Sequence, residues 1–225
     1  MVFKFLRGEG RERLEGIEQR VQTMLGYDRH EFDLAMSALL GRVRADEVNQ
    51  ELRETDQKVN RLEREIRREL VVHASVFGGI QSPAVLVYMS VVKDVERIGD
   101  YAKNLPDLAR DGANFSAGPN LEFWKGLSAE ISEFIAASGE AFRARDAARS
   151  RALRQRGDEL LDIFDERVSG LIRAEDPGAQ AVARALAHRY CKRVVAHLMN
   201  LLSAVTMPLD RLDYFDEDPE DRGGA

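Results

Sequence analysis

The sequence has little of what secreted and sheet-rich domains use. Its 225 residues include one cysteine, Cys191, so no intrachain disulfide can form, which suits a reducing compartment. Cys191 has no catalytic partner at a recognisable spacing, and we expect a buried structural thiol. Six prolines and 7% aromatic residues disfavour a β-sandwich, which needs many turns and aromatic strand faces. These shortages leave a helical protein as the expected class.

Several functional classes are also missing their signatures. No stretch approaches the ~20 apolar residues that cross a bilayer, and the N-terminus has too few consecutive apolar residues for a signal peptide. The net charge of −6 provides no basic nucleic-acid surface. Because the sequence contains no P-loop, Gly-x-Gly-x-x-Gly or Gly-x-Ser-x-Gly motif, an ATPase, dehydrogenase or hydrolase is unsupported.

Apolar residues instead recur at helical spacing along almost the whole chain. With 44% hydrophobic and 32% charged residues, the composition suits an amphipathic helical bundle. We predict six long helices over about residues 11–44, 46–76, 82–110, 120–145, 146–174 and 177–212. Apolar positions in the second helix alternate steps of four and three, which is a packing seam. They are Val48, Leu52, Thr55, Val59, Leu62, Ile66 and Leu70.

Two helix boundaries carry explicit signals. Leu105-Pro106 suggests a kink or an earlier end in the third helix, because the residue before a proline disfavours helical geometry. Asp176-Pro177 is a cap residue followed by proline and predicts the start of the sixth helix there.

The second half of the sequence repeats features of the first. Asp56 is followed by apolar residues at plus three, plus six and plus ten, and so is Asp158, roughly 100 residues later. Two further positions recur seven residues apart in the third and sixth helices: Arg97 with Asn104, and Arg193 with Asn200. Each three-helix unit must bury its apolar stripes against its own helices and its sibling. We therefore predict an all-α fold of two tandem three-helix bundles, residues 1–111 and 120–212, and a disordered acidic tail at 213–225.

A pair of carboxylates stands out in the third helix. Glu96 falls inside the broad apolar arc of this helix, and Asp100 lies one turn on, at its edge. A carboxylate facing a core must be protonated, paired or metal-bound. Carboxylates four residues apart, with Cβ atoms about 6 Å apart, can bind cations with further ligands from facing helices. The alternative is an internal salt bridge to Lys93, Arg97 or Lys103, or to an arginine from another helix.

The residues around this pair resemble a known family signature. The run from Asp94 to Asn104, Asp-Val-Glu-Arg-Ile-Gly-Asp-Tyr-Ala-Lys-Asn, is similar to the signature of the PhoU family, acidic-x-Glu-Arg-Ile-Gly-Asp followed by an Ala and an Asn or Asp. In the second helix, Asp56, Val59 and Asn60 resemble the family's first-repeat pattern. Chain length and the two three-helix units agree, so the resemblance extends over essentially the whole chain, and the Asp94–Asn104 segment is its specific part.

The resemblance implies a cytoplasmic regulator, not an enzyme, of inorganic phosphate uptake and phosphate-responsive signalling. Such a protein would dock on the ATPase of the phosphate ABC transporter or on a phosphate-sensing histidine kinase, form a homodimer and reach the membrane only through these partners. It would hold a divalent or iron-type ion, iron or zinc, on Glu96 and Asp100, with Asp56 as an added ligand. The remaining motif residues would support the site: Asp94, Arg97, Gly99 and Asn104.

The second copy of the motif departs from the family pattern. Lys192 stands where the family has Glu, and Ala196 where it has Asp. The rest of the frame is kept by Arg193, His197 and Asn200. Because a lysine repels a cation, we expect at most one metal site, in the first repeat. Lys192 is expected to form an ion pair with Asp158 or Asp162 instead.

Two other functions remain open at this point. A helical-bundle enzyme with a carboxylate-bridged metal centre usually needs Glu-x-x-His motifs on paired helices, and none occurs at a matching place. A metal-free structural helical adaptor would have its carboxylates salt-bridged. Metal content and turnover distinguish these possibilities.

Overall fold

The computed structural model describes residues 9–77, 82–117 and 120–212, which contain only helices and their connections. The helices are α1 (Glu9–Leu39), α2 (Ala45–Phe77), α3 (Ser82–Ala102), α4 (Asn104–Arg110), α5 (Leu121–Ala144), α6 (Ala147–Arg173), α7 (Ala181–Thr206) and the 3-10 helix η3 (Leu209–Arg211). Within these ranges six long helices are present, and the predicted all-α fold is confirmed. None of the described helices is long and apolar enough to cross a membrane.

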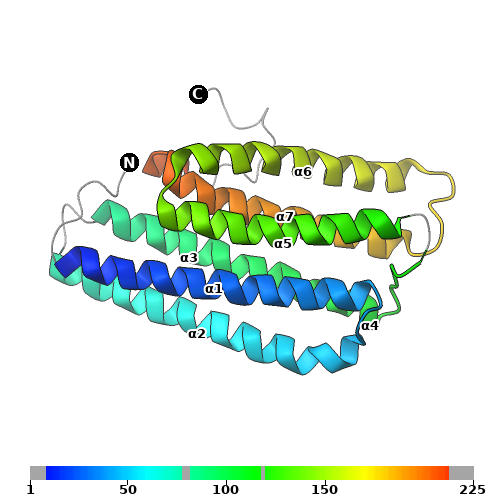
Figure 1. Cartoon of the computed structure of the whole chain (residues 1–225), viewed down its shortest axis with the longest axis horizontal. Coiled ribbons are helices and arrows are strands. Elements are labelled where there is room, and N and C mark those ends of the chain that lie inside the picture. The colour runs from blue at the N-terminus through cyan, green and yellow to red at the C-terminus, as the bar shows by residue number, and fades with distance from the viewer. Residues whose placement is uncertain (1–8, 78–81, 118–119, 213–225) are drawn as a thin grey trace.

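The long helices form two packed groups (Figure 1). α1, α2 and α3 pack together with the short α4, and α5, α6 and α7 form the second group. Contacts of α1 with α5 and of α3 with α7 join the groups, and one continuous apolar core runs through both. The tandem three-helix architecture is thus confirmed. The exact limits at residues 111, 120 and 212 stay predictions, and the acidic tail at 213–225 lies outside the described residues.

The apolar stripes explain why these helices form and pack. Six of the seven predicted seam positions of α2 are buried, and Leu62 is partly buried. Trp124 of α5 and Tyr88 of α3 are among the largest fully buried side chains. Full burial of a Val, Leu, Ile or Phe side chain contributes roughly 1.5–3 kcal/mol, so packing outweighs helix propensity here. Cys191 is buried as expected, and burial raises the pKa of its thiol to about 12.

Two helix ends in the first group differ from or refine the prediction. α1 ends at Leu39, not near residue 44, because Gly41 adopts a left-handed conformation with φ +66°. The backbone N–H of Phe115 then donates to the Leu39 carbonyl at 2.8 Å. α3 ends at Ala102, as the Leu105-Pro106 signal suggested, since Pro106 has no N–H to donate to the Ala102 carbonyl.

The start of the last long helix was predicted wrongly. α7 begins at Ala181, four residues after Pro177. Gly178 and Gln180 both have positive φ, +75° and +65°, so the chain turns sharply before it can enter a helix. This helix also ends earlier than the predicted residue 212: α7 stops at Thr206, and η3 follows.

Candidate metal centre

Carboxylates from three helices converge where α1, α2 and α3 pack. Asp28 experiences the charges of four other carboxylates. We call the five residues the acidic cluster: Asp28 and Glu31 of α1, Asp56 of α2, and Glu96 and Asp100 of α3. Three of them were predicted from the sequence as ligands, and the two on α1 were not.

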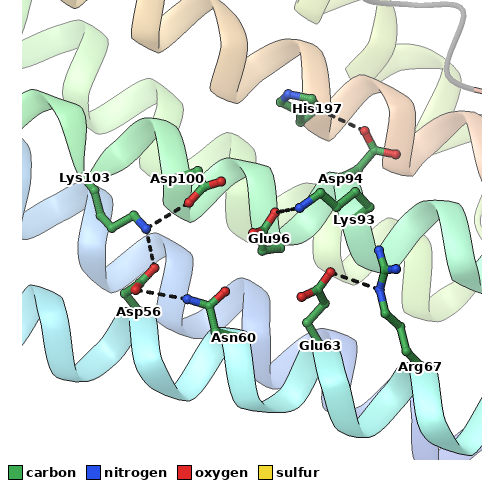
Figure 2. A network of polar contacts seen from close by, with 10 residues as sticks. All are labelled: Asp56, Asn60, Glu63, Arg67, Lys93, Asp94, Glu96, Asp100, Lys103 and His197. Atoms are coloured by element: carbon green, nitrogen blue, oxygen red, sulfur yellow. Dashed lines mark hydrogen bonds and ion pairs between the residues drawn. The ribbon is translucent and has the colours of Figure 1, made fainter.

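The predicted pair lies as the helical periodicity indicated. The Glu96 side chain is only 11% exposed, and that of Asp100, at the edge of the apolar arc, is 34% exposed. Lys93 Nζ lies 2.5 Å from Glu96 Oε2, three residues along the same helix (Figure 2). The inward-facing carboxylate of Glu96 is therefore already paired with the more exposed Lys93.

Lys103 connects the other two predicted ligands. Its Nζ lies 2.5 Å from Asp56 Oδ1 and 2.9 Å from Asp100 Oδ1, and so bridges α2 and α3 (Figure 2). Asn60 Nδ2 donates to the second oxygen of Asp56 at 3.0 Å. Partial burial would lower the pKa of Lys103, but its hydrogen bonds to Asp100 and Asp56 raise it above the ordinary lysine value. The salt bridge to Lys103 that the sequence offered as an alternative is therefore present at Asp100, and it extends to Asp56.

The two carboxyl groups on α1 have no such partner. Asp28 and Glu31 are both 0% exposed, and none of their four oxygens has a hydrogen-bond partner among the described residues. Burial, followed by the charge of Glu31, raises the pKa of Asp28 well above its ordinary value. Burial, followed by the charge of Asp56, raises the pKa of Glu31 to about 8. Burial and the neighbouring carboxylates therefore favour the neutral form of both groups.

Gly99 provides the space for these two carboxyl groups. A Cβ atom at position 99 would stand 2.8 Å from Asp28 Oδ1 and 2.8 Å from Glu31 Oε2. A larger residue at position 99 would force these carboxyl groups to shift, so the glycine between Glu96 and Asp100 suits the close approach of α3 to α1. A sequence signal was available: Asp28 interrupts the apolar series of α1 between Met24 and Phe32.

The residues present fit a hard or borderline divalent cation. Buried carboxyl groups without partners, all-oxygen donors and ligands from facing helices are the features that such ions use. As the side chains stand, no three Asp, Glu, His or Cys residues of the described chain are grouped to hold an ion. The ammonium of Lys103 forms ion pairs with both Asp56 and Asp100, so a metal cation must compete with it for these carboxylates.

Asp94, the first residue of the motif, lies away from the acidic cluster. It is buried at the contact of α3 with α7, where it accepts a hydrogen bond from Asn200 Nδ2 at 3.1 Å. Its Oδ1 also lies 2.9 Å from His197 Nδ1, as Figure 2 shows. The ring of His197 stacks on Tyr101, with centroids 5.6 Å apart. The first motif is thereby fastened to the second across the two bundles.

The remaining residues of the first motif have separate positions. Arg97 is exposed. Asn104 donates from Nδ2 to the backbone carbonyl of Asp100 at 3.1 Å, where α3 ends. The residues of the predicted motif thus have three different roles. Glu96 and Asp100 belong to the acidic cluster, Asp94 contacts the second bundle, and Asn104 binds the end of α3.

In the second bundle, the lysine side chain of Lys192 stands where the first motif has Glu96. Lys192 forms an ion pair with Asp165, and the expected partners Asp158 and Asp162 were wrong. Side chains of a helix lean toward its N-terminus, and the start of α7 lies beside the end of α6 (Figure 1), so Lys192 reaches the later aspartate. Ala196 is buried. Arg193 lies over the ring of Tyr101, 5.5 Å from its centroid.

Comparison with known families now identifies the first bundle. The sequence model of the PhoU domain matches residues 21–108, a range that includes all five residues of the acidic cluster. The predicted resemblance to the PhoU family is confirmed.

Solved PhoU structures share the fold of most of the chain. The crystal structure of PhoU from Pseudomonas aeruginosa matches with a TM-score of 0.73 at 21% identity, over 86% of this chain and 95% of that chain. The phosphate transport system regulatory protein PhoU from Streptococcus pneumoniae matches with a TM-score of 0.67 at 16% identity, over 84% and 93%. At these identities the likeness establishes the fold. No curated protein matches the sequence significantly.

Proposed function

We propose that this chain regulates inorganic phosphate uptake and phosphate-responsive signalling, and does so by docking and not by catalysis. The observation that carries the proposal is the PhoU domain at residues 21–108 with its acidic cluster. The fold of the described chain is also that of a phosphate transport system regulatory protein. Its partners would be the ATPase of a phosphate ABC transporter, a phosphate-sensing histidine kinase, or both. The proposal includes a cytoplasmic location and a homodimer.

The acidic cluster would hold a divalent or iron-type ion, with iron or zinc as the candidates. Glu96 and Asp100 would be the main ligands, with Asp56 and the neutralised pair Asp28 and Glu31 around them. When bound, the ion would supply positive charge that links α1, α2 and α3. Ion binding would ionise the buried carboxyl groups, since a cation favours the charged form of a nearby carboxylate. With the ion bound to carboxylates of all three helices, α1, α2 and α3 would move less relative to one another.

The regulatory proposal is tested in the source cell with the gene deleted. Phosphate uptake and a phosphate-repressed reporter are measured at high phosphate, with and without the wild-type gene. We expect loss of repression on deletion and its return with the gene, as well as co-purification of the chain with the transporter ATPase or the kinase. Unchanged uptake and reporter activity in the deletion strain would contradict the proposal.

The metal proposal is tested by elemental analysis of purified protein. We expect bound iron or zinc in the wild type and its loss in the double variant Glu96→Gln with Asp100→Asn. Glu12→Gln, an exposed change on α1, is the matched control and should keep the ion. Circular dichroism shows whether each variant keeps its helices.

A metal-free adaptor is the second candidate, because Lys103 already satisfies two of the predicted ligands. It predicts a wild-type protein that regulates phosphate uptake without iron, zinc or another divalent ion. Metal-depleted protein that binds the partner as strongly as untreated protein would favour this second candidate.

A further inference from the structure

A second site candidate lies in the other bundle and shares no residue with the acidic cluster. A cavity of about 480 Å³ opens between the start of α5, the end of α6 and the start of α7. Its volume is in the range of small-molecule sites. The residues that matter for its chemistry are Asn120, Glu166, Arg167, Arg184 and His188.

The cavity carries two guanidinium groups with unused donors. Arg167 lies over the ring of Phe123, 4.4 Å from the ring centroid, and forms no ion pair with a described residue. Arg184 donates one hydrogen bond to the Pro177 carbonyl, and its buried Nε has no partner among the described residues. Glu166 is the one acid among the described lining residues, so two arginines face one carboxylate. The charged groups of the wall therefore favour an anion.

His188 is the buried polar group of this wall. It is 4% exposed, and its Nδ1 has no hydrogen-bond partner among the described residues. Its ring stacks on Trp124 with centroids 4.5 Å apart, and Trp124 packs on Phe115 at 4.7 Å, which fixes the ring in place. Burial, and then the charges of Arg167 and Arg184, lower the pKa of His188 to about 4. The wall thus holds a neutral imidazole beside two arginines and a single carboxylate, Glu166.

Helix direction adds to the positive potential here. α5 and α7 both begin at this end of the second bundle (Figure 1). Asn120 precedes α5, and its side chain makes no capping hydrogen bond. The first N–H groups of a helix and the positive end of its dipole favour a bound anion. Asn120 is therefore free to direct its amide group into the cavity that it lines.

We propose that this cavity binds a small phosphoryl compound, with the phosphoryl group between Arg167 and Arg184 and with His188 and Asn120 as further polar contacts. Guanidinium groups fit both phosphate and carboxylate oxygens. The choice of phosphate rests on the proposed function in phosphate regulation. The cavity admits free inorganic phosphate or a phosphate ester, and the experiment separates these sources.

Binding is measured by isothermal titration calorimetry on the full chain with inorganic phosphate, pyrophosphate and ADP, and with succinate as a dicarboxylate comparison. We expect at least one phosphoryl compound to bind more tightly than succinate. If inorganic phosphate binds most tightly, the natural ligand is the free ion. If ADP binds most tightly, the natural ligand is a phosphate ester. Arg167→Gln should weaken binding about tenfold or more, since it removes a charge-assisted contact. Arg167 is exposed, so this variant should fold normally.

Arg173→Gln is the matched control, because Arg173 is an exposed arginine of the same helix that does not line the cavity. It should bind like the wild type. A second readout follows the His188 ring by NMR: a bound anion should raise the pKa of His188, and this rise should vanish in Arg167→Gln.

Three results would overturn the site: no binding of any phosphoryl compound, equal or tighter binding of succinate, or unchanged binding in Arg167→Gln. Failure here is distinguishable from failure of the regulatory role. The gene-deletion experiment does not use this cavity, and Arg167→Gln should leave iron or zinc content unchanged. A regulator that binds no phosphoryl compound would disprove the cavity alone.

Discussion

Replacing Glu31 by glutamine tests the electrostatic account of the acidic cluster. The glutamine keeps nearly the same shape in a position that is 0% exposed, and it removes the only ionisable group there. In the wild type, burial and the charge of Asp56 raise the pKa of Glu31 from 4.5 to about 8. The variant should therefore differ from the wild type in how its stability depends on pH.

The sign and size of the effect follow from proton linkage. Between pH 4.5 and about 8, the unfolded chain has lost the Glu31 proton while the folded chain still holds it. The folded state binds more protons, so the free energy of unfolding falls as pH rises through this window. One pKa unit corresponds to about 1.4 kcal/mol. From pH 5 to pH 8 the wild type should lose about 3 kcal/mol more stability than Glu31→Gln.

The assay is urea unfolding at pH 5 and pH 8, with a chelator present to remove divalent ions. Glu12→Gln, on the exposed face of the same helix, is the control and should follow the wild type. Asp28 is present in all three proteins, but Glu31→Gln also removes one of the charges that raise the pKa of Asp28, so the difference from the wild type reports the coupled pair Asp28 and Glu31. The same loss of stability with pH in Glu31→Gln as in the wild type would refute the account of a buried, neutral carboxyl group.

Four further substitutions test the packing of glycines, the cation at the acidic cluster and the contact between the two bundles. Gly99→Ala should lower the free energy of unfolding by about 1–3 kcal/mol, because its Cβ would meet two carboxyl oxygens at 2.8 Å, whereas Gly126→Ala, with open space, should raise it by roughly 0.5–1 kcal/mol. Lys103→Met should tighten zinc binding about tenfold in a competition with a fluorescent chelator, because it removes the cation that bridges two cluster carboxylates. Asp94→Asn should cost about 1–3 kcal/mol in urea unfolding by weakening the contact with His197, and an unchanged midpoint would argue against that contact.

The helices could be predicted from the sequence, and their ends only in part. The apolar seam of α2 follows from the periodicity of its own residues. The early end of α3 follows from the proline at position 106, which cannot donate a backbone hydrogen bond. The start of α7 was misplaced because a left-handed turn at Gly178 and Gln180 follows Pro177. Pro177-Gly178 is itself a turn signal, but Gln180 adopts positive φ without being a glycine, so the sequence did not show that the turn extends to residue 180.

The candidate metal centre was predicted in part: Glu96 and Asp100 of α3 from helical periodicity, and Asp56 of α2 from the family resemblance, but not the two residues on α1. Glu96 and Asp100 share a face by helical geometry, and the sequence alone indicates this. Asp28 and Glu31 join them because α1 and α3 pack closely at Gly99. Their contribution depends on the rotation of α1 about its own axis, which the sequence pattern leaves open.

By itself, the sequence determined the helical class, the paired motifs and the inward face of Glu96, because each is a property of a single helix and its period. Tertiary structure alone decided which partners those residues have. Asp94 meets Asn200, and Arg167 and Arg184 line one cavity, across distances in the chain that no local pattern spans. The physical reason is that through-space neighbours depend on how packed helices are rotated and offset, which buried side chains throughout the core determine together.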